Sequence, residues 1–230
     1  KELQTSMAGV DGSVTLELVS LDRGVFSSTA HYRLKGQGSV FGEDNPNPEL
    51  LFVDHIEHGP LPFSRLVTLK WLPVMATSHY ELEKNPTTEK WFAASKDVSP
   101  LKGVANIGYS RSVSGNIELL PLEFKEATSS VSFSGANLNF DSSAEGQKVK
   151  AEGFMNSLKV AAVDAEGAPF EAELAGLTVA SNLEKTTFGF YTGQNTVELT
   201  DTKVTFGPQK AVLTLKGFEQ KDSSETKDNN

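Results

Sequence analysis

Two closely spaced histidines are the first candidates for chemistry in this chain. His55 and His58 stand three residues apart and are flanked by Asp54 and Glu57, residue types that bind metal ions or exchange protons. The surrounding run alternates like a β-strand, and residues i and i+3 of a strand point to opposite faces. Zinc enzymes instead use histidines at i and i+4 of a helix. We therefore expect both histidines to be structural, with a hydrolase or metal-dependent enzyme at the His55/His58 corner as the alternative.

The residues after this strand must form a stiff corner. Gly59 follows His58 and precedes Pro60, with Pro62 two residues further on. Proline donates no hydrogen bond to a β-ladder, so two prolines at this spacing exclude a central strand. Glycine tolerates a positive φ or a close backbone contact that other residues do not. The sequence therefore predicts that His58-Gly59-Pro60 is a folding determinant.

Other kinds of catalytic or binding site find little support in the sequence. It contains no Gly-x-Ser-x-Gly elbow and no phosphate-binding loop, and we expect no cofactor and no catalytic residues. Cysteine is absent, so disulfides and thiolate chemistry are excluded. The formal net charge of −9 argues against a nucleic-acid partner. No apolar run approaches the roughly 18 residues that a membrane-spanning helix needs.

The elements that would position any site are mostly strands. Runs rich in Val, Thr, Ser and Phe alternate with Gly, Asn and Asp, a pattern typical of a mainly β protein. We expect one domain over residues 1–219, built as an elongated, curved antiparallel sheet or meander. Its parts are N-terminal strands and the corner (1–70), a small mixed subregion (71–100) with a short helix near 89–97, and repeat-like strands (101–219). Residues 220–230 are polar and predicted to be a disordered tail.

Three glycines mark a repeat in the second half. Gly135, Gly176 and Gly217 are each 41 residues apart, and apolar alternation slips by one position at each of them. A glycine bulge in a strand produces such a slip. A period near 40 is also typical of a propeller blade, but a long curved meander fits the pattern better.

The same strands predict an apolar face. Eight residues form it: Phe133, Leu138, Leu158, Leu174, Leu177, Leu199, Leu213 and Leu215. No helix of useful length is predicted after Lys96 to cover them. Such a face can pack against a second sheet, form a homodimer, bind another protein, or hold a lipid or other apolar ligand.

Several short motifs resemble the YdgA/YihF-like family of bacterial cell-envelope proteins of unknown function. They are Arg23-Gly24-Val25-Phe26-Ser27-Ser28, His58-Gly59-Pro60-Leu61-Pro62 and Pro73-Val74-Met75-Ala76. The resemblance implies a periplasmic body tethered to the inner membrane by an N-terminal segment that precedes this chain. It supplies no catalytic residues. We therefore expect a non-catalytic envelope protein that binds a lipid, an apolar ligand or a protein partner, or else a self-associating structural module.

Overall fold

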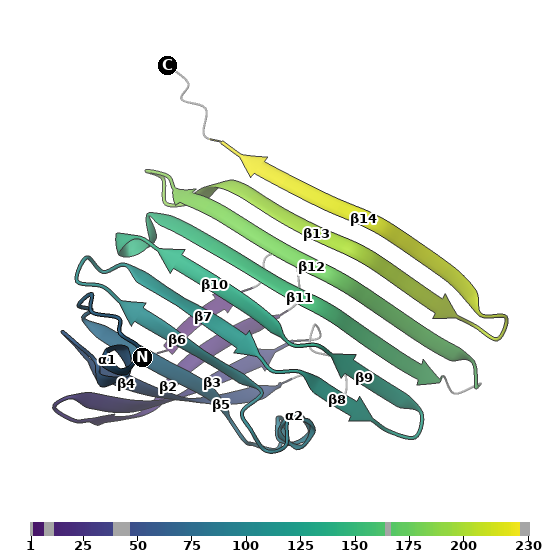
Figure 1. Ribbon diagram of the computed structural model, residues 1–230, viewed down its shortest axis with the longest axis horizontal. Helices are drawn as coiled ribbons and strands as arrows, with labels where there is room; N and C mark the ends of the chain where they lie inside the picture. The colour runs from purple at the N-terminus through teal and green to yellow at the C-terminus, as the bar shows by residue number, and fades with distance from the viewer. Residues whose placement is uncertain (1, 7–11, 39–46, 164–166, 226–230) are drawn as a thin grey trace. The chain divides into compact units, whose positions relative to one another are not determined.

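The computed structural model describes residues 2–6, 12–38, 47–163 and 167–225, and this part of the chain is mainly β (Figure 1). The chain divides into two compact units, Lys1–Gly108 and Tyr109–Asn230. Strand pairs within each unit are antiparallel, which confirms the predicted fold class. No helix in the described ranges is long and apolar enough to cross a membrane.

The first unit is a sheet in which each strand pairs with the next one in the sequence, β1-β2-β3-β4-β5-β6. The strands are β1 (Glu2–Ser6), β2 (Ser13–Arg23), β3 (Ser27–Gln37), β4 (Glu49–His58), β5 (Ala76–Glu83) and β6 (Leu101–Ile107). Two short helices lie in the connections, α1 (Phe63–Val67) and α2 (Glu89–Ala94).

Helix α2 lies where the sequence predicts a short helix, near 89–97, and it follows a polar turn. The Asn85 side chain accepts a hydrogen bond from the Thr88 amide at 2.9 Å, and the Thr88 hydroxyl accepts one from the Asn85 amide at 2.9 Å. Such reciprocal bonds satisfy backbone donors before a helix starts. The helix buries Phe92, and Leu82 of β5 is also buried, at 2% exposure. This small core anchors the middle of the unit.

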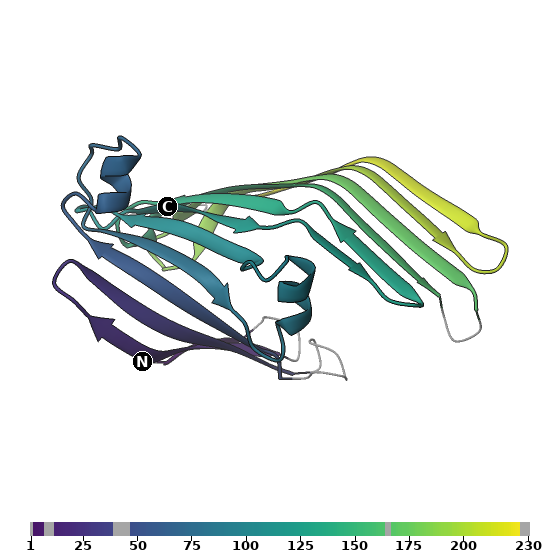
Figure 2. The ribbon, with the colours of Figure 1, turned by 60° about the horizontal axis from the view of Figure 1, so that its bottom comes forward.

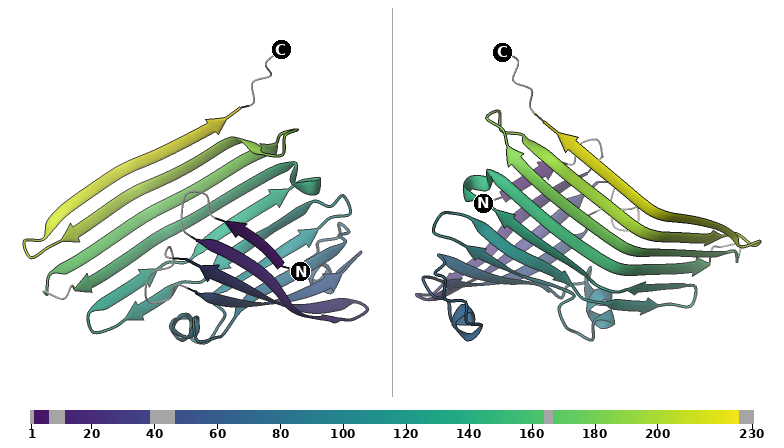
Figure 3. Two further views of the ribbon diagram at one scale, coloured as in Figure 1. Left: turned by 180° about the vertical axis from the view of Figure 1, so that it is seen from behind. Right: turned by 45° about the horizontal axis from the view of Figure 1, so that its top comes forward.

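The second unit contains the long strands (Figure 3). They are β7 (Val113–Leu119), β8 (Leu122–Lys125), β9 (Ser129–Phe133), β10 (Ala136–Ser142), β11 (Lys148–Val163), β12 (Pro169–Lys185), β13 (Tyr191–Phe206) and β14 (Ala211–Ser224), with a 3-10 turn η2 (Ala144–Gly146) before β11. The strand order is β7-β10-β11-β12-β13-β14, and β8 pairs with β9, which pairs with β11.

The three repeat glycines lie in one row across this sheet. Their φ angles are positive: +86° at Gly135, +66° at Gly176 and +65° at Gly217. The ladder is interrupted at Gly176, yet Met155 pairs with Leu177 and Ser157 with Ala175, so the register is the same on both sides. The neighbouring strands break in the same row, at Asn156 and Thr200.

The prediction that these three glycines form β-bulges is wrong. The glycines do interrupt the strands, but no strand carries the extra residue that defines a bulge. All strands kink together instead, and Figure 2 shows β11 to β14 bending partway along their length. Along the row, glycines alternate with residues that carry a side chain, which are Asn156 and Thr200.

Two further predictions need correction. The residues Thr186–Tyr191, whose Thr and Phe content predicts a further strand, instead form a hairpin turn up to Phe190, closed by a hydrogen bond from the Thr186 amide to the Phe190 carbonyl at 2.8 Å. The predicted tail begins too early, because β14 continues to Ser224 by pairing with β13, where Gln220 lies opposite Val197. Polar composition suggested disorder, but backbone pairing with a neighbouring strand overrides local propensity. Residues 226–230 lie outside the described part of the chain.

Candidate functional site

The predicted corner is held by backbone contacts with two other segments. The His58 amide donates to the Phe26 carbonyl at 2.8 Å, and the Gly59 amide donates to the Met75 carbonyl at 2.7 Å. The Val74 amide in turn donates to the Pro60 carbonyl at 3.0 Å. The three motifs that carry the family resemblance therefore meet at one place in the first unit.

Gly59 is required there by space. A Cβ atom on Gly59 would lie 1.8 Å from the Val74 carbonyl oxygen and 2.8 Å from that of Met75. Its φ lies outside the positive range that favours glycine, so the close backbone contact is the reason for this residue. At the neighbouring hairpin, the Gly24 amide donates to the Ser27 carbonyl at 2.8 Å. A Cβ atom on Gly24 would lie 2.7 Å from the same carbonyl oxygen.

The two histidines of the corner bind separate partners. His58 Nε2 lies 3.0 Å from the Ser28 hydroxyl, and His55 Nδ1 lies 3.2 Å from the Thr29 hydroxyl. Ser28 and Thr29 are consecutive residues of β3, so their side chains, like those of His55 and His58, leave opposite faces of the sheet. Within the described residues, no group of three or more His, Cys, Asp or Glu side chains could hold a metal ion.

A polar cluster that the sequence did not predict joins α1 to the sheet. The Glu57 carboxylate accepts hydrogen bonds from the Ser64 hydroxyl at 2.5 Å and the Ser64 amide at 3.1 Å. His79 Nε2 lies 3.2 Å from the same hydroxyl. A carboxylate that receives both donors of one residue fixes the start of the helix. No spacing rule in the sequence links these three residues, because the corner and a strand pairing separate them.

A buried carboxylate perturbs two tyrosines in the same sheet. Asp54 is 8% exposed and accepts a hydrogen bond from the Ser78 hydroxyl at 2.7 Å. Burial raises the pKa of Tyr32 and of Tyr80, and the Asp54 charge raises both further. These phenols keep their protons to higher pH than free tyrosine.

The second unit contains an apolar groove of about 200 Å³ beyond the kink. Its lining comes from four strands: Ile117, Leu119, Ala136, Asn137, Leu138, Gly153, Phe154, Met155, Leu177 and Val179. Gly153 forms its floor, since a Cβ there would lie 2.9 Å from Leu138 Cδ1 and 3.1 Å from Val179 Cγ2. The glycine thus lets two aliphatic side chains approach the strand from its two neighbours.

The predicted apolar residues form rows across the strands. Before the kink, Leu158 lies opposite both Phe133 and Leu174. Beyond it, Leu177 pairs with Leu199, and Leu138 pairs with Gly153 in the groove. The last two predicted residues, Leu213 and Leu215, lie on β14 and are 64% and 48% exposed.

The alternate positions of the same strands are polar. Lys159 pairs with Glu173 across β11 and β12 with their charged atoms 2.7 Å apart, and Lys203 lies opposite Glu173 on β13. The apolar positions of β12 change from even to odd numbers at Gly176, as Leu174 and Leu177 illustrate. The sheet is therefore amphipathic on both sides of the kink.

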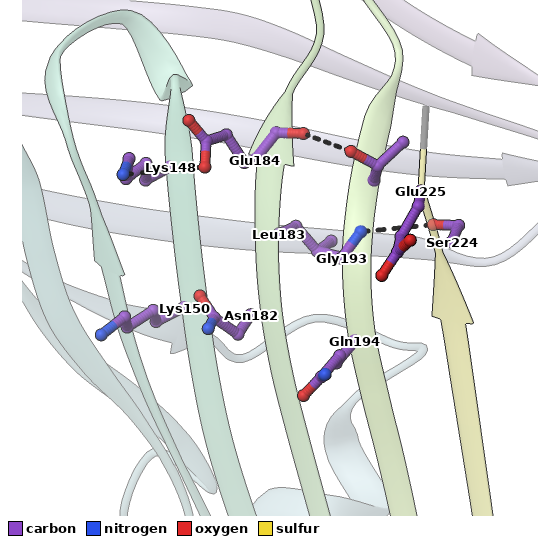
Figure 4. Close-up of a pocket in the computed structure, with 10 residues that line it drawn as sticks. Lys148, Lys150, Asn182, Leu183, Glu184, Gly193, Gln194, Ser224 and Glu225 are labelled. Atoms are coloured by element: carbon purple, nitrogen blue, oxygen red, sulfur yellow. Dashed lines mark hydrogen bonds and ion pairs between the residues drawn. The ribbon is translucent and has the colours of Figure 1, made fainter. Parts of the chain in front are cut away.

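A further hollow in the second unit is polar. It measures about 680 Å³ and lies between Lys148, Lys150, Asn182, Glu184, Thr192, Gln194, Ser224 and Glu225, with Leu183 and Gly193 (Figure 4). The Gly193 amide donates to the Ser224 hydroxyl at 3.2 Å, and Lys148 lies 3.6 Å from Glu184. Both ends of this ion pair are more than 60% exposed, so water screens it. We assign no chemistry to this hollow.

Comparison with known proteins gives relatives without an established function. The chain is 24% identical to Protein YdgA of Escherichia coli strain K12 over 220 residues, which cover 94% of this chain and 43% of that protein. It is 27% identical to the uncharacterized protein YihF of the same organism over 112 residues, 48% of this chain and 24% of YihF. A Haemophilus influenzae uncharacterized protein is 39% identical over 62 residues, 27% of this chain and 16% of that protein.

The matched segments thus cover less than half the length of each of these relatives. No solved structure matches it. The family described as "Bacterial protein of unknown function (DUF945)" matches residues 3–230. The chain therefore belongs to the DUF945 family.

Proposed function

We propose that the chain is a non-catalytic binding module whose second unit holds the acyl chains of a lipid on its apolar face. The observation that carries the proposal is the groove of about 200 Å³, in which aliphatic side chains from β7, β10, β11 and β12 converge. A ligand there meets methyl and methylene groups, with Asn137 as the polar side chain of the lining.

The composition of the groove favours a lipid over a protein partner. The residues that carry most of the binding energy in protein interfaces are enriched in Tyr, Trp and Arg. The groove lining has none of these three residue types. An alkyl chain needs no oriented polar contact, and burial of apolar surface stabilises it by about 25 cal/mol per Å².

The kink extends the face that such a ligand could use. A strand that continued straight through Gly176 would turn Leu174 and Leu177 to opposite faces. We infer that the break at Gly176 keeps both on the same face, because Leu158–Leu174 and Leu177–Leu199 form apolar rows on either side of it. An acyl chain could therefore follow the rows beyond the groove, past Leu158 and Leu174.

Displacement of an environment-sensitive apolar dye by oleic acid tests the proposal. The matched variants are Leu177→Lys in the groove and Thr178→Lys, the next residue, which lies opposite Glu198 at a polar position. We expect wild-type protein and Thr178→Lys to bind the dye, and Leu177→Lys to lose at least about tenfold in affinity. Circular dichroism would establish that both variants are folded. A monomeric wild-type protein that binds no dye would refute the proposal, and a concentration-dependent dimer that hides the dye site would favour self-association.

The periplasmic location implied by the family resemblance is part of the proposal. Cell fractionation of the full-length protein tests it, with recovery in the cytoplasmic fraction as the contradicting result.

A further inference from the structure

The apolar face of the second unit turns polar at one end of its outer strands. Beyond the kink, three successive rows cross β12, β13 and β14, each two residues further along the strands than the last. They are Leu177, Leu199 and Phe218, then Val179, Val197 and Gln220, and then Ser181, Asn195 and Asp222. Residues two apart in a strand share a face. The third row, the polar row, therefore lies on the same side of the sheet as the groove.

The polar row adjoins the groove. Val179 lines the groove, and Ser181 follows it two residues, or about 7 Å, further along β12. On the inner strands the same row stays apolar, with Ala151 of β11 opposite Ser181 and Phe140 of β10 opposite Ala151. An amphiphile whose chain occupies the groove can thus place its polar end on the outer strands without leaving the face.

The polar row offers hydrogen-bond donors beside a carboxylate. The Ser181 hydroxyl donates to Asn195 Oδ1 at 2.8 Å, and an asparagine side chain carries two N–H donors of its own. Asp222 lies directly opposite Asn195 and accepts a hydrogen bond from Gln220 Nε2 at 3.0 Å. Adjacent strands are about 4.8 Å apart, so donors and negative charge stand side by side.

We propose that the polar row binds the headgroup of an ethanolamine phospholipid whose acyl chains occupy the groove. The Asn195 side-chain amide donates to the phosphate, and the Asp222 carboxylate pairs with the ammonium. Two carbons join phosphate and ammonium in this headgroup, so the two groups can reach adjacent strands. This inference rests on the proposed function and adds the class of lipid to it.

The charge of the row disfavours anionic lipids. None of the residues in the three rows is Lys, Arg or His. The nearest lysine along β14, Lys221, lies on the opposite face and pairs with Glu219. A headgroup with a phosphate and no ammonium would therefore place its negative charge beside Asp222, and like charges in contact are unfavourable.

Displacement of the apolar dye from the full-length protein, by ligands that share one oleoyl chain, tests the proposal. The ligands are oleoyl lysophosphatidylethanolamine, oleoyl lysophosphatidylglycerol and oleic acid, each used below the concentration at which it forms micelles. The test variant is Asp222→Asn, which removes the charge and keeps the size of the side chain. Asp141→Asn is the matched control, because Asp141 is also exposed but lies on the polar face, opposite Lys150.

We expect wild-type protein and Asp141→Asn to bind the ethanolamine lipid about fivefold more tightly than the glycerol lipid, the upper end of what an exposed ion pair contributes. Asp222→Asn should reduce this preference to within about twofold. Oleic acid should displace the dye from all three proteins, which separates acyl binding from headgroup recognition.

Displacement by oleic acid with no preference between the two lysolipids would overturn the headgroup proposal and leave the acyl site standing. A preference that persists in Asp222→Asn, or that Asp141→Asn lowers equally, would also overturn it. No displacement by any ligand would refute the proposed function itself. Binding by the 230-residue chain that the full-length protein lacks would show that the chain's own continuation covers the row, and this too would overturn the proposal.

Discussion

Gly176 and Gly217 provide a matched test of what the kink requires of its residues. The two have almost the same φ, but Thr200 Oγ1 lies 2.3 Å and Thr200 Cβ 2.8 Å from the Cβ position of Gly176, whereas the space at Gly217 is open. Replacing either glycine with alanine places an L-residue in the left-handed region, at a cost of about 1–2 kcal/mol. Gly176→Ala must also displace Thr200, which adds about 1–3 kcal/mol of overpacking.

Urea denaturation followed by far-UV circular dichroism measures both free energies of unfolding. We expect Gly176→Ala to lose about 2 kcal/mol more than Gly217→Ala. Because β14 is an edge strand, its fraying reduces the loss of stability measured for Gly217→Ala. Thr200→Ala therefore provides the control. It removes Oγ1 and should recover part of the loss in the Gly176→Ala background but none in the Gly217→Ala background. Equal losses at the two glycines, or no recovery with Thr200→Ala, would refute the reasoning.

Three other predictions concern the first unit. Gly59→Ala should destabilise the protein by about 3 kcal/mol, since the new atom would lie 1.8 Å from a backbone oxygen; an unchanged urea midpoint would show that the corner is an ordinary loop. The raised pKa of Tyr32 and Tyr80 means that the folded chain holds phenol protons more tightly than the unfolded chain. The free energy of unfolding should therefore be fully present below pH 10 and fall above it, and this fall should be smaller in Tyr80→Phe. Identical alkaline unfolding curves for wild type and Tyr80→Phe would contradict this. Elemental analysis of protein purified without chelator should find no stoichiometric zinc, because His55 and His58 bind separate hydroxyls, whereas zinc that is lost in His58→Ala would show a metal site.

The fold class could be predicted because its signals are local. Alternating apolar residues predicted the strands, and the short helix predicted near 89–97 is α2. The 41-residue spacing of the three glycines located the interruption in each strand. It could not decide between a bulge and a shared kink, because that depends on where the neighbouring strands break. Asn156 and Thr200, which complete the row, have no signal of their own in the sequence.

The site was predictable in its residue types but not in its shape. The eight apolar residues were visible from their alternation, whereas the approach of Leu138 and Val179 to Gly153 requires the register of three strands. The cluster of Glu57, Ser64 and His79 was invisible for the same reason. The corner motif pointed to Gly59, but its close approach to Val74 involves a residue fifteen positions away and could not be specified.

Native mass spectrometry of gently extracted protein tests the central claim, that the second unit holds acyl chains, most directly. The account predicts adducts with the masses of acyl lipids on wild-type protein and on Thr178→Lys, and their loss on Leu177→Lys. Wild-type protein without lipid adducts, or adducts that persist equally on Leu177→Lys, would contradict it.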